Sequence, residues 1–275
     1  MMSSSKTINT GRNLPVATVV GLAMMAAIVG SLYYAPLVFA CLAAFMGAMA
    51  ARELLAFDPE SSSRLPRGTI LIAVPFIILV AFGEGIERAG VWLAVWCIVI
   101  ALRRLSGGVE HFARDAGASI AIVLYTGFLL GFAADLANSD NALGRVMTLV
   151  LLTSANDTGG YFAGILFGRH PMVPAISPKK SWEGFAGSVV LAMIIGAFAV
   201  PYLIDIQPLE GAIFGALMAF SATAGDLVES AIKRDAGIKD SGHSIPGHGG
   251  FLDRIDSQLI NAPVAWVALV AVFGV

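Results

Sequence analysis

Residues 230–256, SAIKRDAGIKDSGHSIPGHGGFLDRID, form a polar stretch between two long apolar segments. The stretch holds four Lys or Arg residues, four carboxylates, two histidines and five glycines. An apolar core does not require such a cluster, whereas a polyanion and a divalent cation bind to groups of these kinds. The stretch therefore predicts a ligand site at the edge of a membrane, and the apolar segments around it set the fold class.

The composition of the whole chain is that of a membrane protein. Of its 275 residues, 57% are hydrophobic and 13% are charged, and the mean hydropathy is +0.80. A soluble domain carries about twice that charged fraction, and apolar runs of membrane-spanning length recur from end to end. We predict an all-α, polytopic integral membrane protein. Nothing in the sequence indicates nucleic acid as a partner, and Cys41 and Cys97 indicate neither a disulfide nor a zinc site.

Nine apolar segments are expected to form the membrane helices. The third and fourth are short for a full crossing, so a re-entrant or strongly tilted path is an alternative for them. The expected ranges are 14–33, 35–55, 69–83, 89–102, 119–137, 146–168, 186–206, 211–233 and 258–275.

The distribution of positive charge predicts the orientation of these helices. With the N-terminus in the cytoplasm, the cytoplasmic segments hold 15 of the 17 Lys and Arg residues, and only Arg88 and Arg145 fall outside. The positive-inside rule then favours nine helices, with the N-terminus inside and the C-terminus outside. We expect an uncleaved first helix and a single membrane domain, with no assigned role for residues 1–145 and the chemistry in residues 146–275.

Asp157 lies in the middle of the sixth expected helix. An ionisable group there costs about 2.5–3.5 kcal/mol on insertion scales unless it faces a polar cavity or a partner. A protonated or hydrogen-bonded structural aspartate is the alternative interpretation. Gly160, Gly164 and Gly168 follow at intervals of four residues and predict close helix packing.

A second cluster, at residues 177–184, offers hydroxyl groups and positive charge to an anion. It contains Ser177, Lys179 and Lys180, and it falls in an expected cytoplasmic loop. An ordinary positive-inside loop with Trp182 as an interfacial anchor explains the same residues equally well.

Asp226, Ser230, Lys233 and Arg234 have the spacing of one helix face at the end of the eighth helix. A carboxylate, a hydroxyl and two cations in one row suit a metal-bound phosphate chain. The alternative is a buried ion pair between Asp226 and Lys233, which would leave Glu229 and Arg234 without an explanation.

The rest of the polar stretch combines cations, glycines and paired carboxylates. Glycines let the backbone approach a phosphate closely, and carboxylates three residues apart on a helical turn face the same way. Such hard oxygen ligands favour Mg²⁺, which binds through one or two carboxylates and substrate phosphates. The candidate residues are Lys239, Asp240, His248, Gly249, Gly250, Asp253 and Asp256.

Residues 230–256 resemble the signature of the phosphatidate cytidylyltransferases, the CDP-diacylglycerol synthases. The matching positions are Ser230, Lys233, Arg234, Lys239, Asp240, Pro246, His248, Gly249, Gly250, Asp253, Arg254 and Asp256. Residues 157–162, DTGGYF, and 177–184, SPKKSWEG, resemble two further segments of that family. Gly160 replaces a usual alanine, and Ile165 stands where a basic residue is common. The resemblance covers roughly the C-terminal half.

The resemblance implies a reaction of CTP with phosphatidic acid that yields CDP-diacylglycerol and pyrophosphate at the cytoplasmic face of a membrane, such as the bacterial inner membrane. It implies Mg²⁺ with a second cation nearby, and a homodimer. The metal would be held by Asp226 and Asp253, with Asp256 beside them. Ser230, Lys233, Lys239 and the backbone of 247–250 would hold phosphates, with help from Lys179 and Lys180. Asp157 would orient a ligand or face the lipid headgroup.

Two other functions fit parts of the pattern. An organic-anion transporter also has polar groups within its helices, but here these groups cluster at one face and no inverted halves are evident. A CDP-alcohol phosphotransferase, or another CTP-dependent lipid transferase, would perform related chemistry, but the Asp-Gly-x₂-Ala-Arg motif of the phosphotransferases is absent.

Overall fold

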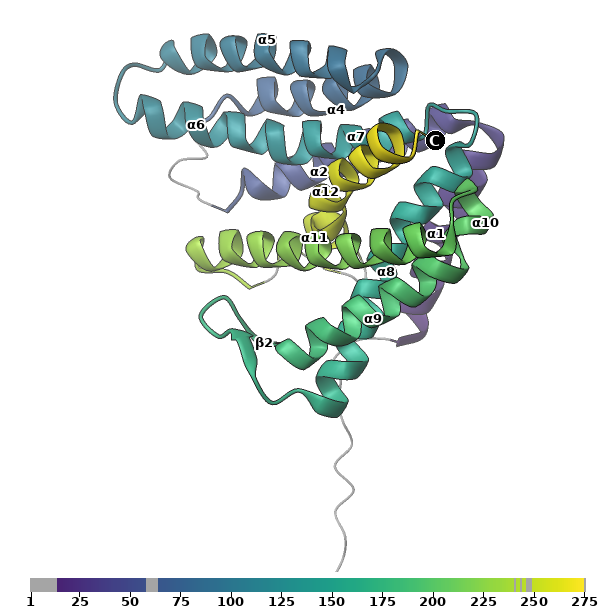
Figure 1. The fold of residues 1–275 in the computed structure, drawn as a ribbon. Coiled ribbons are helices and arrows are strands. Elements are labelled where there is room, and N and C mark those ends of the chain that lie inside the picture. The colour runs from purple at the N-terminus through teal and green to yellow at the C-terminus, as the bar shows by residue number, and fades with distance from the viewer. Residues whose placement is uncertain (1–13, 58–63, 240, 243, 246–248, 275) are drawn as a thin grey trace, which may run out of the picture.

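The structure of the chain is a computed structural model, and it describes residues 14–57, 64–239, 241–242, 244–245 and 249–274. Helices dominate, and one short β-hairpin lies between two of them (Figure 1). In chain order the elements are α1 (Leu14–Tyr34), α2 (Pro36–Leu54), α4 (Arg67–Glu84), α5 (Ile86–Leu105), α6 (Phe112–Val123), the π-helical turn η1 (Leu124–Phe128), α7 (Leu129–Leu136), α8 (Ala142–Phe167), β1 (Pro171–Val173), β2 (Ser177–Ser181), α9 (Trp182–Phe198), α10 (Val200–Ile204), α11 (Pro208–Asp235), α12 (Leu252–Trp266) and the π-helical turn η2 (Val267–Phe273).

Each of the nine apolar segments is helical, which confirms the mostly helical prediction. The expected shortness of the third and fourth helices is wrong, because α4 has 18 residues and α5 has 20. At 1.5 Å per residue these helices are about 27 and 30 Å long. The charged residues at their ends, such as Arg67 and Arg103, belong to the helices and do not end them.

Among the described residues, five helical stretches are long and apolar enough to cross a membrane. They are Pro36–Leu54, Arg67–Glu84, Phe112–Leu136, Pro208–Asp235 and Leu252–Phe273, and shorter apolar helices occur at Val19–Tyr34 and Trp182–Phe198. Large apolar side chains remain exposed on the outside of the bundle, such as Phe198 and Tyr202, as expected for lipid contact.

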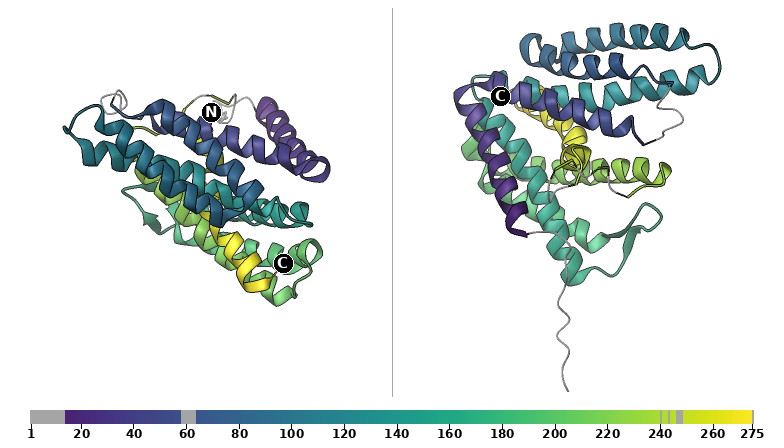
Figure 2. Two further views of the ribbon diagram at one scale, coloured as in Figure 1. Left: turned by 90° about the horizontal axis from the view of Figure 1, so that it is seen from above. Right: turned by 180° about the vertical axis from the view of Figure 1, so that it is seen from behind.

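The helices form two groups with α12 between them. In Figure 1 helices α4, α5 and α6 lie side by side at the top, and α11 crosses below them. The other group consists of α8, α9 and α11, which pack on one another. Helix α12 contacts both α7 and α11, and α1 packs against α2 and α8 (Figure 2).

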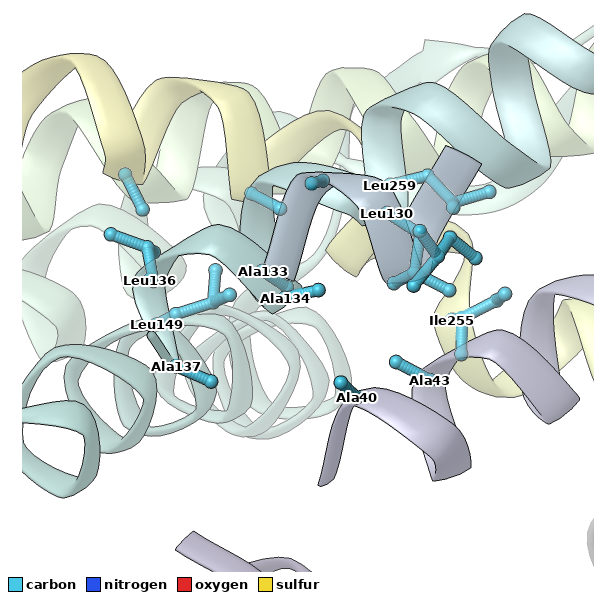
Figure 3. Packing of buried hydrophobic residues seen from close by; sticks show 14 of the residues in the cluster. Ala40, Ala43, Leu130, Ala133, Ala134, Leu136, Ala137, Leu149, Ile255 and Leu259 are labelled. Carbon is cyan, nitrogen blue, oxygen red and sulfur yellow. The ribbon is translucent and has the colours of Figure 1, made fainter. Parts of the chain in front are cut away.

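The core lies where α2, α7, α8 and α12 meet (Figure 3). Small residues dominate this contact, including Ala40, Ala43, Ala133 and Ala134, and larger ones such as Leu259 fill the space between the helices. Small side chains allow helices to approach closely, which is the usual packing mode within membranes. This core fixes α12, and with it the carboxylates at the start of that helix.

Glycines bring α9 into backbone contact with both α8 and α11. A Cβ atom at Gly187 would lie 2.8 Å from the carbonyl oxygen of Gly159, and one at Gly196 would lie 2.0 Å from that of Gly211. The predicted packing role is thereby confirmed for Gly160, where a Cβ would meet Ser188 Oγ at 2.7 Å, whereas Gly168 follows the end of α8 and a Cβ there would meet the carbonyl oxygen of Gly164 at 2.3 Å. Helix α9 is therefore held on two sides by helices that carry site residues.

Gly196→Ala is expected to destabilise the bundle by about 1–3 kcal/mol, because the added methyl group would overlap the backbone of α11. The midpoint of thermal unfolding in detergent, followed by circular dichroism, measures this loss. Gly83→Ala on α4 is the matched control, since an added Cβ there meets nothing within 4 Å. Equal midpoints for the two variants would contradict the backbone contact between α9 and α11.

The fold departs from an all-α protein at residues 171–181. Strands β1 and β2 pair in antiparallel fashion, with Pro171 opposite Ser181 and Val173 opposite Ser177. The segment expected to be a loop is therefore a hairpin that leads directly into α9. Ser181 Oγ accepts a hydrogen bond from the Gly184 amide (3.1 Å) and caps α9.

Candidate active site

Strand β2 carries the two predicted lysines to the side of α11. Lys180 Nζ donates to Asp226 Oδ2 at 2.7 Å, and both side chains are largely buried. Lys179, the preceding residue of the strand, is exposed. Glu183 accepts hydrogen bonds from the amides of Arg169 (3.1 Å) and His170 (3.2 Å), so it closes the base of the hairpin. The hairpin that carries the two lysines is thus held in place by the hydrogen bonds to Glu183.

Helix α8 carries Asp157, and the hydrogen bonds of the preceding residue, Asn156, set the position of the Asp157 side chain. Asn156 Nδ2 donates to Asp157 Oδ1 at 3.1 Å, and Thr223 Oγ1 of α11 donates to Asn156 Oδ1 at 3.0 Å. Ser188 Oγ of α9 donates to the Asn156 carbonyl at 2.6 Å. Asn156 therefore fixes Asp157 relative to the two packed helices.

These elements enclose a cavity of about 240 Å³. Its lining comes from α8, the hairpin, the start of α9 and α11, and it includes Asp157, Tyr161, Lys179, Lys180 and Asp226. The structure thus brings together residues from three separate sequence motifs, and this cavity is the candidate active site.

Helix α12 adds a further carboxylate beside Asp226. Ser257 Oγ donates to Asp226 Oδ1, and the Ser257 amide donates to Asp256 Oδ1 at 2.8 Å. The Asp256, Asp226 and Asp157 carboxylates lie close enough to interact electrostatically. The result is a cluster of carboxyl groups opposite the hairpin lysines.

Lys233 lies one to two turns farther along α11 and holds a separate ion-pair network. Its Nζ lies 2.5 Å from Glu229 Oε2 and 3.0 Å from Asp253 Oδ1. The alternative of an Asp226–Lys233 pair is wrong, because Asp226 pairs with Lys180 from the hairpin. Glu229 is 1% exposed, and its partner is the lysine one turn away.

Asp253 also fixes the polar loop that precedes α12. Its Oδ2 accepts hydrogen bonds from the amides of Gly250 (2.9 Å) and Ser241 (3.3 Å). Gly249 has φ of +81°, and a Cβ there would lie 2.8 Å from Asp253 Oδ2. Glycine is therefore needed at 249 both for the backbone conformation and for the approach of the carboxylate.

The remaining predicted residues lie around this centre. Ser230 is half-buried on α11, Ser177 is half-buried on β2, and Lys239 is exposed after α11. Arg234 donates to the carbonyls of Ile176 (3.3 Å) and Ile238 (3.0 Å), so it ties the hairpin to the end of α11. Asp240 and His248 lie outside the described residues.

The donor chemistry at Asp226, Asp256 and Ser257 fits Mg²⁺, which prefers hard oxygen ligands. Within the described part of the chain, no three Asp, Glu, His or Cys side chains converge on one cation position. Substrate phosphates would complete the coordination, as is usual for this ion. Asp253 already has both carboxylate oxygens bonded to Lys233 and to loop amides.

A second cavity of about 900 Å³ lies between α2, α6, η1 and the end of α11. Its lining is mainly apolar and includes Leu54, Phe57, Leu129 and Ile232. Tyr125 also lines it, and the Tyr125 hydroxyl interacts electrostatically with the carboxylates of α11 and α12. Tyr125 is thus a residue of the larger cavity that lies near the carboxylates of the candidate site.

Sequence reasoning missed several residues of this site. Asn156 and Ser257 were neighbours of candidates, and only the helix packing shows what they contact. Glu53, at the end of α2, is buried against the polar loop and accepts four hydrogen bonds from the loop and the start of α12. No pattern in the sequence separates Glu53 from an ordinary charged residue at a helix end.

The chain is similar to known cytidylyltransferases over nearly its whole length. Residues 15–272 match the Cytidylyltransferase family. The chain is 36% identical to a phosphatidate cytidylyltransferase of Mycobacterium leprae, over 97% of this chain and 91% of the relative. It is 31% identical to one of Staphylococcus aureus, over 85% of this chain and 90% of the relative. The similarity also includes an uncharacterised protein of Escherichia coli, YnbB, at 39% over 62% of this chain. The similarity to the phosphatidate cytidylyltransferases thus extends well beyond the C-terminal half, to which the sequence motifs had limited it.

Proposed function

The chain belongs to the phosphatidate cytidylyltransferase family, whose members make CDP-diacylglycerol for phospholipids, and we propose that catalysis takes place in the cavity between α8, the hairpin and α11. The observation that carries the proposal is the Lys180–Asp226 pair in the wall of that cavity. Lys180 would bind a phosphate of the nucleoside triphosphate, and Asp226 with the neighbouring carboxylates would bind its counterion.

In the proposed reaction an oxygen of the phosphatidate phosphate forms a bond to the α-phosphorus of CTP. The bond between the α-phosphorus and the bridging oxygen breaks, and pyrophosphate leaves. The attacking phosphate is already an anion, so the reaction needs no strong general base. The protein must bring two anions together and neutralise their charge. Lys179 and Lys180 would supply positive charge from the hairpin side, and Lys233 and Lys239 from the end of α11.

We propose Mg²⁺ as the cofactor, bound by Asp226 and Asp256, and Asp253 would join them only by exchanging its bonds to Lys233 or to the loop amides. When bound, the ion would neutralise charge on the triphosphate and on the leaving pyrophosphate. Hydrogen bonds and an ion pair within the chain hold the residues of this site in position without the metal ion. Asn156 orients Asp157, Ser257 holds Asp226, and Lys180 balances the negative charge.

The lipid substrate would enter beside the nucleotide. The larger, mainly apolar cavity suits acyl chains, and Tyr125 in its wall lies near the carboxylates of α11 and α12. We also propose that this site faces the cytoplasm. In Figure 1 the α5–α6 turn, the hairpin and the end of α11 lie on the left, while the α4–α5 turn and α10 lie on the right. The first set carries most of the loop cations, which supports a cytoplasmic position.

Sealed membrane vesicles of both orientations test function and face together. With radiolabelled CTP, Mg²⁺ and phosphatidate, inside-out vesicles are expected to form a labelled, chloroform-soluble product at once. Right-side-out vesicles are expected to form it only after detergent is added, since CTP does not cross a bilayer. Product in intact right-side-out vesicles would contradict the proposed face. A lack of product in detergent would contradict the enzyme function, and uptake of unchanged CTP would favour a transporter.

A further inference from the structure

Glu53 connects the N-terminal half of the chain to the signature loop, the segment between α11 and α12 (residues 236–251). It lies on the last turn of α2, and it is 9% exposed. Its Oε1 accepts hydrogen bonds from the Phe251 amide (3.0 Å) and Ser244 Oγ (3.0 Å). Its Oε2 accepts from the Leu252 amide (2.9 Å) and Ser241 Oγ (3.3 Å). Four donors from the loop and the start of α12 therefore surround a buried carboxylate.

Two of these donors are the backbone amides at the start of α12. Such amides have no partner within their own helix, and the helix dipole favours a negative charge beside them. Glu53 therefore acts as a cap for α12 although it lies 199 residues away from Leu252 in sequence. The carboxylate fixes where α12 begins, and the catalytic candidates Asp253 and Asp256 lie in the first turns of that helix.

The glycines of the loop fit around this carboxylate. A Cβ at Gly250 would lie 2.6 Å from Glu53 Oε2, and one at Gly242 would lie 2.9 Å from Glu53 Oε1. Gly250 thus has a role besides any contact of its backbone with phosphate. It leaves room for the side chain that holds the loop.

Glu53 and Asp253 hold the same loop from two sides. Ser241 donates its hydroxyl to Glu53 and its amide to Asp253. Asp253 in turn accepts from Lys233, which also pairs with Glu229. A shift of the loop would therefore move Asp253 and Lys233 together.

We propose that Glu53 is a positioning residue for nucleotide binding, which holds the signature loop and the start of α12 in place for the triphosphate. This assignment rests on the proposed function. Glu53 acts through the loop, and it would touch neither the substrate nor the metal ion. The N-terminal half thereby takes part directly in building the site.

Glu53→Gln is the sharpest test, because it keeps the size of the side chain. It removes the charge and puts an NH₂ group among groups that all donate. The KM for CTP is expected to rise by about 10-fold or more, with the KM for phosphatidate unchanged. Glu87→Gln, at an exposed site on α5, is the matched control and is expected to leave both constants unchanged.

A purely structural role would give a different result. Loss of folded protein lowers the maximal rate at an unchanged KM for CTP, and that outcome would overturn the proposal. If Glu53→Gln does not fold, Ser244→Ala decides, since it removes one hydrogen bond to Glu53 at an exposed residue. A KM for CTP raised several-fold supports the proposal, and an unchanged one overturns it. If the wild-type chain is inactive, the proposed function fails as well, whereas an active wild-type with an unaffected Glu53→Gln overturns the Glu53 assignment alone.

Discussion

Asp226→Asn is expected to lower turnover by at least about 100-fold while the helical bundle stays folded. The Asp226 carboxylate accepts from Lys180 and Ser257, and it is one of the proposed metal ligands. Asparagine keeps the shape but removes the charge that holds Lys180 and would attract Mg²⁺. The measurement is the rate of lipid-linked product formation in detergent, at saturating CTP and over a range of Mg²⁺ concentrations.

Asp205→Asn is the matched control for this change. Asp205 is exposed at the end of α10, in a left-handed conformation that asparagine adopts readily. Its replacement is expected to leave turnover within about 2-fold, as for most surface substitutions. Turnover of Asp226→Asn close to that of the control would rule out Asp226 both as a metal ligand and as the partner that matters for Lys180.

The second large effect is expected at the turn between α5 and α6. Asp115 is fully buried and Arg104 is 2% exposed. Asp115 Oδ2 accepts from Arg104 Nε (2.9 Å) and Nη2 (2.7 Å), and from Arg64 Nε (3.1 Å). Asp115→Ala leaves a buried guanidinium without its carboxylate, so it is expected to destabilise the protein by about 3–5 kcal/mol. Thermal and denaturant unfolding in detergent measure this change.

The combination of Asp115→Ala with Arg104→Leu separates the charge from the packing. Removal of both members of a buried pair is often far less damaging than removal of one. The double variant is therefore expected to be more stable than Asp115→Ala alone. A double variant that is less stable would show that Arg104 acts mainly through its bonds to the carbonyls of Gly108 and Glu110.

The sequence predicted the helices well because each apolar segment is long and is bounded by polar residues. The errors at α4 and α5 arose from treating charged residues as helix ends, although long basic side chains can reach the interface from within a helix. The hairpin at 171–181 was missed, and its two strands are short and contain Pro171 and Pro178, a residue type that is rare in sheets. Both prolines lie in short strands of a two-stranded sheet, where few backbone donors are needed.

The family was also predictable, since the signature residues are fixed in type and in spacing. The residues with which these signature residues pair were not predictable from the sequence. The pairing of Lys180 with Asp226 depends on how the hairpin lies against α11, and that of Lys233 with Asp253 depends on how α12 packs against α11. Glu53 contacts residues nearly 200 positions away, and no local pattern marks such a contact. The site is therefore a product of tertiary packing, to which the motif contributes only part.

The ion pair between Lys180 and Asp226 has a consequence for the catalytic cycle. A phosphate group that binds Lys180 must compete with Asp226, and a cation that binds Asp226 must compete with Lys180. In the proposed reaction, substrate entry would therefore exchange the partners of Lys180 and Asp226, and the original ion pair would re-form once the product has left. Such an exchange would limit how tightly the product is held, and it would couple release of the product to recovery of the resting enzyme.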